Sequence, residues 1–232
     1  MKNIIITGAS GGIGRETALQ LAKDPDNRLF LISRDSAKLN ALLNGINDYH
    51  DRVFTYAFDL ISGDYALMAE TIMKHLGTVD VLINNAGVLI KKPFAQISES
   101  DFDLIINTNF KAPFHLIQHL LPLFNQGAHI VNISSMGGFQ GSAKFPGLSL
   151  YSASKSALAS LTECLAVELE PMKISVNCLS LGSVRTDMFE KAFPGYEAQT
   201  SVDTIASWIA YFAMNGHKWM NGKILPISLS TP

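Results

Sequence analysis

The sequence has little cysteine, and its cysteines are not arranged as a disulfide framework or a zinc site would require. Cys164 and Cys178 are the only two, and they do not form a CxxC pair. A structural zinc site needs closely spaced Cys or His ligands, and a disulfide-stabilised domain needs several pairs. We therefore expect free, mostly buried thiols and no metal centre.

Long hydrophobic runs and an excess of charge are also missing. The apolar run at residues 4–6 is too short for a secretory signal, and no run approaches the ~18 residues of a membrane helix. A net charge of −2 gives no reason to expect nucleic acid or an acidic membrane as partner. The sequence thus predicts a cytoplasmic protein without nucleic-acid or membrane partners.

What is present is an apolar chain with alternating strand and helix patterns. Apolar residues make up 47% of the 232 residues and charged residues 16%, which suits one well-buried domain covering residues 1–232. The alternation predicts an α/β fold, a doubly wound, Rossmann-like parallel sheet with helices on both faces. Its seven strands are expected at Lys2–Thr7, Arg28–Ser33, Arg52–Phe58, Val79–Ile83, Ala128–Ile133, Ile174–Leu179 and Lys223–Ile227.

The connections between the later strands are less regular. We expect one helix over Glu99–Phe124, bent near Pro113, and a second from about Tyr151 to Glu170. A glycine-containing loop over Met136–Leu150 precedes the second helix. Asp187–Thr200 is expected to form a loop or a short helix before a last helix at Val202–Asn215.

A glycine-rich turn directly follows the first strand. Residues 7–14 read TGASGGIG and are followed by the helical run RETALQLAK. A strand, a glycine turn and a helix in this order form the context of a dinucleotide site, in which the backbone approaches a pyrophosphate at the helix N-terminus. No GK[ST] follows, which disfavours a nucleoside-triphosphate P-loop.

The end of the second strand carries two competing signals for the cofactor. Asp35 lies about twenty residues after the last glycine, where an acid binds a ribose 2′-hydroxyl and favours NAD. Arg34 is instead suited to a 2′-phosphate, Ser33 does not repel one, and Arg15 adds a second cation, so we favour NADP over NAD. In the alternative without a ligand, Asp35 or Ser36 caps the next helix.

Polar residues follow the third and fourth strands as well. Asp59, just after the third strand, either accepts from an adenine amino group or stabilises a turn. The sequence NNAG at residues 84–87 follows the fourth strand, where its small residues and amides would lie in the ligand crevice of an open α/β sheet.

Tyr151 and Lys155 form the pair with the clearest catalytic chemistry. They are four residues apart in the first turns of a predicted helix, so they share a face. An ammonium beside a phenol favours the phenolate, and we expect it to lower the pKa of Tyr151 from ~10 toward neutrality. Such a phenol would act as an acid–base catalyst.

Seven motifs in one order resemble the single-domain branch of the short-chain dehydrogenases/reductases. They are TGASGGIG at 7–14, Asp59-Leu60, NNAG at 84–87, INTNF, NISS, YSASK and LGSVRTDM. The resemblance implies NADP(H)-dependent interconversion of a carbonyl and an alcohol. It also implies a catalytic set formed by Asn109, Ser135, Tyr151 and Lys155.

The resemblance assigns a role to each member of that set. Tyr151 would protonate the carbonyl oxygen, Ser135 would hydrogen-bond the same oxygen, and Lys155 would lower the phenol pKa and hold the nicotinamide ribose. Asn109 would position a water that connects Lys155 to solvent. Ser135 is preferred over Ser134 as the second serine of the family motif, and Asn107 is the alternative to Asn109.

By the same resemblance, the cofactor is held by the glycine turn, by the ends of three strands and by the segment after the sixth. Val184 would meet the carboxamide through its backbone, and Thr186 would use its hydroxyl. The implied cofactor residues are Gly8, Ser10, Gly12, Ile13, Gly14, Ser33, Arg34, Asp59, Leu60, Asn85, Ala86, Gly87, Tyr151, Lys155, Val184 and Thr186.

The substrate is the least determined part of the prediction. We expect a small or medium, mostly apolar ketone or aldehyde, in a pocket lined by Phe94, Phe139, Phe145, Leu148, Met188, Phe189 and Phe193. The alternatives are a 3-oxoacyl thioester reductase, whose acidic carrier would need a basic patch, and an NADP-sensing protein without turnover. The candidates for that patch are Lys91, Lys92, Lys144 and Arg185.

Two departures from the family pattern affect the end of the chain. Leu181-Gly182 replaces the usual Pro-Gly, and Ser228-Leu-Ser-Thr-Pro232 replaces the usual Asp-Gly-Gly. The family resemblance implies a homo-oligomer, a dimer or a tetramer. The altered end leaves its mode of assembly open.

Overall fold

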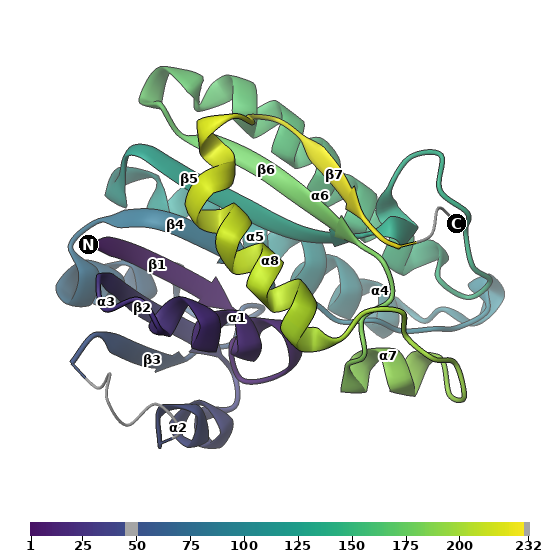
Figure 1. The fold of residues 1–232 in the computed structure, drawn as a ribbon. Helices are drawn as coiled ribbons and strands as arrows, with labels where there is room; N and C mark the ends of the chain where they lie inside the picture. Colours follow the sequence, from purple (N-terminus) through teal and green to yellow (C-terminus); the bar gives the residue numbers. More distant parts are fainter. Residues whose placement is uncertain (45–50, 230–232) are drawn as a thin grey trace.

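The computed structural model describes residues 1–44 and 51–229, which form a parallel sheet flanked by helices (Figure 1). The sheet has seven strands in the order β3-β2-β1-β4-β5-β6-β7. The strands are β1 (Lys2–Thr7), β2 (Asn27–Ser33), β3 (Val53–Ala57), β4 (Val79–Asn84), β5 (Phe124–Ser135), β6 (Ser175–Leu181) and β7 (Ile224–Ile227). The predicted seven-stranded, doubly wound α/β fold is confirmed.

Helices cover both faces of this sheet. The main helices are α1 (Gly12–Ala22), α2 (Ser36–Asn44), α3 (Tyr65–Leu76), α4 (Glu99–Ile106), α5 (Ala112–Leu120), α6 (Ser149–Glu168), α7 (Asp187–Ala192) and α8 (Val202–Asn215). Short 3-10 turns lie at Phe94–Gln96, Leu121–Leu123, Met136–Gly138, Glu170–Met172 and Gly216–Lys218. None of the helices in the described part of the chain has the length and hydropathy needed to span a bilayer.

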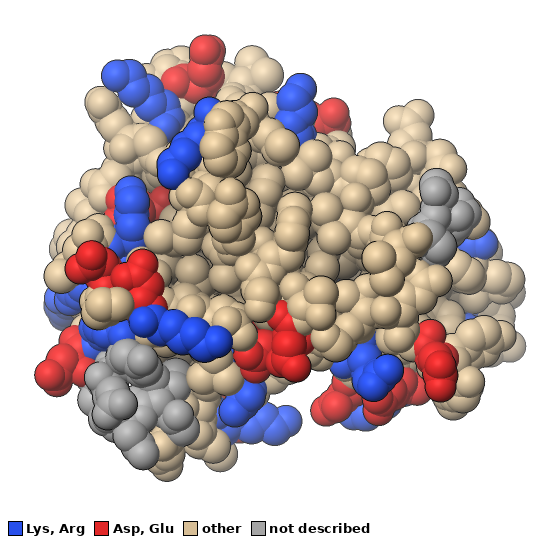
Figure 2. All heavy atoms as spheres, viewed as in Figure 1, with Lys and Arg blue, Asp and Glu red and all other residues tan. Residues whose placement is uncertain are grey.

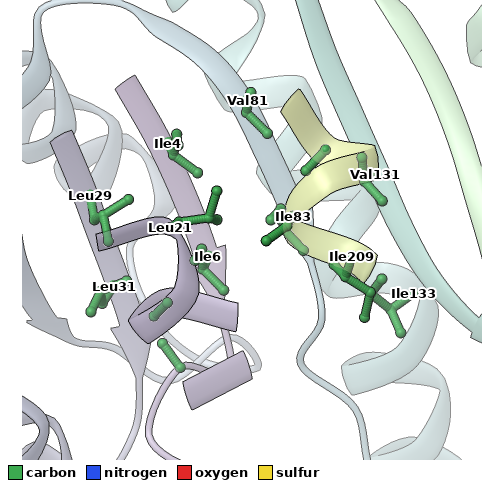
Figure 3. Close-up of a cluster of buried hydrophobic side chains, with 14 of the residues drawn as sticks. Ile4, Ile6, Leu21, Leu29, Leu31, Val81, Ile83, Val131, Ile133 and Ile209 are labelled. Atoms are coloured by element: carbon green, nitrogen blue, oxygen red, sulfur yellow. The ribbon is translucent and has the colours of Figure 1, made fainter. Parts of the chain in front are cut away.

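The alternation of side chains along β1 divides the core into two layers. Ile4 and Ile6 belong to the layer under α1, α2 and α8 (Figure 3), whereas Ile5 belongs to the layer under α3, α5 and α6. All three isoleucines are fully buried. A strand with both faces covered has no solvent side, which is why β1 is a continuous apolar run.

Charged side chains lie around the periphery of the molecule. In the view of Figure 1, lysines and arginines are interspersed with acidic residues along the edge, and the middle of that face, over β7 and most of α8, is uncharged (Figure 2). Cys178 is buried in β6, but Cys164 is exposed because it lies on the outer side of α6, so the expectation of mostly buried thiols is wrong for Cys164.

The predicted helix over Glu99–Phe124 is continuous from Glu99 to Leu123, but its turns are not regular. A π-helical turn, Asn107–Lys111, separates α4 from α5, and the chain is already extended from Phe124, four residues before the predicted start of the fifth strand. The reason is local: Pro113 has no N–H to donate to the Asn109 carbonyl, and Pro122 ends the helical segment soon after α5. Such wide turns are frequent at functional sites.

The order of the strands determines where a ligand can bind. The chain moves outward from β1 to β2 and β3 and then returns to the other side of β1 with β4. In open α/β sheets, ligands bind beyond the carboxyl ends of the strands at such a reversal. The ends of β1 and β4 carry the glycine turn and the NNAG sequence.

Candidate active site

A cavity of about 810 Å³ lies at this reversal. Its wall combines the glycine turn, the residues after β4 and β5, the start of α6, and the segment around α7. Predicted site residues in the wall are Gly8, Gly12, Ile13, Asn85, Ala86, Gly87, Ser135, Tyr151, Lys155, Val184 and Thr186. Ser10, Gly14, Ser33, Arg34, Asp59, Leu60 and Asn109 do not contribute to the wall.

The floor of the cavity is built around the Thr7 hydroxyl. Thr7 Oγ1 accepts hydrogen bonds from the backbone N–H groups of Asn85 and Ala86, at 3.1 and 3.0 Å. The Asn85 side chain in turn donates from Nδ2 to the Thr7 carbonyl at 3.0 Å. Asn85 therefore joins the turn after β4 to the turn after β1, which is a structural role that the sequence analysis did not assign.

Two glycines are required by this close approach. A Cβ on Gly8 would lie 2.9 Å from the Ala86 Cα, and the φ of Gly8 is +68°. A Cβ on Gly14 would collide with the Gly8 carbonyl oxygen and with Asn85 Nδ2. The cavity also receives the N-terminus of α1, whose N-cap residue Gly11 supplies no side-chain cap. The first N–H groups of α1 therefore remain available to an anion.

Two serines connect the glycine turn with the end of β2. The hydroxyls of Ser10 and Ser33 are 2.6 Å apart, and the exposed Arg34 follows directly. Asp35 accepts from the Lys38 backbone N–H at 3.0 Å and its carboxylate lies 3.7 Å from Lys38 Nζ. Asp35 therefore caps α2, which is the alternative that needs no ligand.

Asp59 also has a local structural role. It accepts from the Ile61 backbone N–H at 3.0 Å and from the Ser62 hydroxyl at 2.9 Å. The first of these hydrogen bonds is the main reason that the pKa of Asp59 is lowered, and Arg34 adds a smaller electrostatic contribution. The turn interpretation of Asp59 is thus confirmed, while a contact of Asp59 or Leu60 with adenine stays a prediction.

Ser135 and Tyr151 lie together in the cavity wall. Burial raises the pKa of the phenol, a hydrogen bond with Ser135 partly opposes this rise, and Ser135 Oγ also accepts from the Gly137 backbone N–H at 3.1 Å. Ser134, by contrast, is buried on the other side of β5 and donates to the Lys155 carbonyl at 3.0 Å. The hydroxyls of the two serines therefore point to opposite faces of β5, and that of Ser135 is the one beside Tyr151.

Lys155 is almost fully buried beside this pair. Its Nζ lies 6.0 Å from the centroid of the Tyr151 ring and donates to the Ile133 carbonyl at 2.8 Å. Burial lowers the pKa of Lys155 to about 8. Burial also raises the pKa of Tyr151, and this outweighs the hydrogen bond with Ser135. The predicted downward shift of the phenol is therefore wrong, because the sequence pattern shows the neighbouring ammonium and not the desolvation.

Asn109 lies in the π-helical turn and is completely buried. Its Oδ1 accepts from the Val88 backbone N–H at 2.8 Å, and its Nδ2 donates to the Val88 carbonyl and the Ser154 hydroxyl. A Cβ on Gly87 would lie 3.3 Å from Lys155 Nζ and 3.4 Å from Asn109 Oδ1. Gly87 therefore lies between the lysine and the asparagine.

The remaining wall comes from the segment around α7. Val184 pairs with Thr200 in an isolated parallel bridge, and Thr186 Oγ1 caps α7 by accepting from the Phe189 backbone N–H at 3.2 Å. Predicted pocket residues that do line the cavity are Phe145, Leu148, Met188, Phe189 and Phe193. Phe139 does not contribute to it, and Phe94 is 81% exposed, since it lies on a 3-10 turn at the surface.

The sequence analysis missed several residues of the wall. Leu89, Tyr196, Glu197 and Ser228 line the cavity, together with Lys91, which was considered only for a basic patch. These residues lie in loops or at the end of β7, where no periodic pattern indicates which way a side chain points. The position of Leu89 and Lys91 shortly after NNAG is the one signal that pointed to them.

The chain is similar in sequence to known proteins over almost its whole length. A model of the short chain dehydrogenase family matches residues 2–197. The 3-oxoacyl-acyl-carrier-protein reductase FabG of Staphylococcus epidermidis is 30% identical over 240 residues, which cover 98% of this chain and 97% of the relative.

Solved structures agree over almost the whole chain. A short chain dehydrogenase from Burkholderia cenocepacia in complex with NADP superposes with a TM-score of 0.88 at 26% identity, covering 98% of this chain and 96% of the other. A blue fluorescent protein from a metagenomic library in complex with NADPH has the same TM-score at 28% identity and the same coverage.

Proposed function

The chain belongs to the short-chain dehydrogenase/reductase family of oxidoreductases, and on this premise we propose that it transfers hydride between NADP(H) and a carbonyl or alcohol substrate. The observation that carries the proposal is the arrangement of Tyr151, Ser135 and Lys155 in one cavity at the reversal of the sheet. Tyr151 is the proton donor or acceptor, and Ser135 its partner at the substrate oxygen.

The residues around the cavity fit a dinucleotide. Gly8 and Gly12 of the turn line the cavity and present backbone there without a side chain, and the uncapped N-terminus of α1 suits a pyrophosphate. We assign the nicotinamide ribose to Lys155, whose ammonium lies beside Gly87. When bound, the cofactor supplies or accepts the hydride, and the protein supplies position and proton transfer.

The protonation states of the two groups suit the carbonyl reduction that we propose. The raised pKa of Tyr151 keeps the phenol protonated at neutral pH, so it can donate its proton to a carbonyl oxygen that becomes an alkoxide. With a pKa of about 8, Lys155 is mostly an ammonium at pH 7 and stabilises the phenolate that remains. Ser135 donates to the same oxygen and stabilises its developing charge.

NADP is favoured over NAD by the end of β2. Asp35 is engaged with Lys38, whereas Arg34 is exposed next to the Ser10–Ser33 pair, where a 2′-phosphate would gain two hydroxyls and a guanidinium. The structural relatives crystallised with NADP and NADPH support the same choice. Comparing the dissociation constants of NADPH and NADH by fluorescence titration tests it.

A second candidate function is the reduction of a 3-oxoacyl thioester. It is supported by the name of the Staphylococcus epidermidis relative. The predicted basic patch gives it less support, because Lys92 forms an ion pair with Asp101 at 2.5 Å, and Lys144 donates to the Phe139 carbonyl and the Ser142 hydroxyl. A carrier would therefore meet few unengaged cations at this edge.

The replacement Tyr151→Phe tests the catalytic assignment. We expect kcat for ketone reduction to fall about a thousandfold, since a positioned acid contributes roughly 10²–10⁴ in rate, while NADPH binds as before. Tyr211→Phe, an exposed phenol on α8, is the matched control and should leave kcat unchanged. Equal turnover by native enzyme and Tyr151→Phe would refute the assignment. Tight NADPH binding with no turnover on a broad carbonyl panel would favour a sensor.

A further inference from the structure

Three segments meet where the cavity opens to solvent. Lys91 comes from the loop after β4, Phe145 from the loop before α6, and Phe193 from the end of α7. Lys91 Nζ lies 4.3 Å from the centroid of the Phe193 ring, and the Phe145 ring meets Phe193 edge-on at 6.3 Å. None of these three residues belongs to the motifs that identify the family.

On the side of Lys91 the rim of the cavity is firmly held. The Lys92 backbone N–H donates to the Gly147 carbonyl at 2.9 Å, which joins the two rim loops. A Cβ on Gly147 would lie 3.1 Å from Lys91 Cγ, so the lysine stem packs directly against this glycine. Lys92 is fixed in turn by its ion pair with Asp101. The Lys91 ammonium is therefore presented by a rigid rim.

The α7 side of the opening is held much less firmly. No residue of α7 is buried, and α7 lies outside both helix layers of the sheet (Figure 1). Its segment is connected to the fold at the Val184–Thr200 bridge, where Arg185 N–H donates to the Thr200 carbonyl at 3.0 Å. The contacts of Phe193 with Lys91 and Phe145 therefore join the part of this segment farthest from the bridge to the rim.

We propose that Lys91 and Phe193 form a cation–π latch that makes the enzyme prefer compact carbonyl substrates to carbonyls carried on a long thioester arm. This inference rests on the proposed function and selects between its two candidate substrates. A compact substrate lets the latch close behind it. An acyl group on a pantetheine arm holds the rim and α7 apart during the reaction, so each turnover loses the contact.

The size of the effect follows from the strength of the contact. A cation–π pair at an exposed site favours the contacting state about two- to fivefold. Lys91→Met keeps the stem and removes the charge, so we expect it to raise kcat/KM for acetoacetyl-pantetheine relative to ethyl acetoacetate about threefold. Phe193→Ala removes both ring contacts and should raise the same ratio about tenfold. Lys91→Arg keeps a cation over the ring and should restore the native ratio.

Lys144→Met is the control, because Lys144 lies next to Phe145 on the other rim loop and donates only to local oxygens. It should leave the ratio unchanged. A ratio that stays constant in both Lys91→Met and Phe193→Ala overturns the latch. A change in Lys91→Met that Lys91→Arg does not reverse overturns its cation–π basis.

Amide hydrogen exchange gives a readout that does not depend on turnover. The backbone N–H groups of residues 187–196 should exchange two- to fivefold faster in Lys91→Met than in native protein and in Lys144→Met. Equal exchange rates in all three proteins would refute the latch. If exchange changes as expected but the native enzyme reduces neither substrate, the proposed function fails and the substrate preference with it, while the contact itself stands.

Discussion

The two sides of the cavity are built in opposite ways. In the floor, Thr7 is joined to Asn85 and Ala86 by hydrogen bonds of 3.0–3.1 Å, and Gly8 and Gly14 are packed so closely against their neighbours that a Cβ on either would clash. The wall formed by α7 contains no buried residue and meets the rest of the molecule through a short bridge and through aromatic rings. The floor is fixed, and the α7 wall is easily displaced.

This difference suits two separate roles in the proposed reaction, cofactor binding at the floor and substrate entry at the α7 wall. A cofactor that brings the same pyrophosphate every time suits a floor that cannot move. A substrate that must enter and leave suits a wall with a low cost of opening. We therefore expect positions in the floor where one added methyl group destabilises the protein, and positions on the α7 wall where a whole ring can be removed at little cost in stability.

Among substitutions around the cavity, the largest loss of stability is expected at Gly14. In Gly14→Ala the new methyl group collides with the Gly8 carbonyl and the Asn85 side chain, and because one of these is backbone, the turn itself must shift. We expect the free energy of unfolding to fall by about 3 kcal/mol, the upper range for overpacking, and NADPH binding to weaken with it. This corresponds to a decrease in Tm of about 9 °C.

Gly11→Ala is the matched control for this prediction. Gly11 lies three residues earlier in the same turn, its φ is −164°, and a Cβ there would meet nothing within 4 Å. Its stability should stay within about 1 kcal/mol of the native value. Similar losses in Gly14→Ala and Gly11→Ala would show that the floor is not fixed by close packing.

A buried polar network at the opposite end of the sheet is a second region that is fixed by hydrogen bonds. His129 in β5 is fully buried, its Nδ1 donates to the Ala213 carbonyl at 2.9 Å, and its Nε2 accepts from Asn177 Nδ2 at 3.0 Å. Both ring nitrogens are thus satisfied by the neutral imidazole. Burial lowers the pKa of His129 to about 4, and the neighbouring His217, its pKa also lowered mainly by burial, adds a smaller repulsion.

The second prediction follows from this shift. Unfolded His129 takes up a proton near pH 6.5, whereas folded His129 does so only near pH 4. Its contribution to stability is therefore complete above pH 6.5 and is lost progressively as the pH falls toward 4. Between pH 7.5 and 5 the loss should be about 2 kcal/mol.

Urea unfolding at a series of pH values measures this loss, and NMR titration of the imidazole assigns it. His217 lies 5.4 Å from His129, ring to ring, and with Lys2 and Lys218 nearby it should change stability in the same direction. A stability that is flat from pH 7.5 to 5 would contradict the prediction.

Much of the fold was predictable because the buried elements have simple rules. Ile4, Ile5 and Ile6 predict a doubly covered strand, and the alternation of such strands with helices predicts the parallel sheet. The segment Asn107–Lys111 was not predictable in this way. A π-helical turn inserts one extra residue into the helix and has no periodic pattern in the sequence. Pro113 therefore predicted a bend but not the π-helical turn that produces it.

The candidate site shows the same limit. The glycine turn, Ser135, Tyr151 and Lys155 follow from motifs, and they do meet in one cavity. The direction of the Tyr151 pKa did not follow, because desolvation depends on everything packed around the phenol. Lys91 and Phe193 lie 102 positions apart in the chain and carry no local sign that they touch.

The smallest effect is expected on the α7 wall. Phe189 is partly buried and stacks on Phe193 with ring centroids 5.1 Å apart, a pair worth about 0.5–1.5 kcal/mol. Because α7 buries nothing, we expect Phe189→Ala to lower the free energy of unfolding by less than about 1 kcal/mol. Phe30→Ala removes the same side chain from β2, where it is 1% exposed, and should cost about 3–5 kcal/mol.

Thermal unfolding of these two variants compares the two regions with one chemical change. For a chain of this size each kcal/mol shifts Tm by about 2–4 °C, so the two variants should differ by several degrees. Equal losses would mean that α7 is as firmly packed as the sheet, and an enzyme with such a wall would have to admit its substrate elsewhere. A small loss in Phe189→Ala, with altered KM for ketones, would show instead that this ring serves the substrate and not the fold.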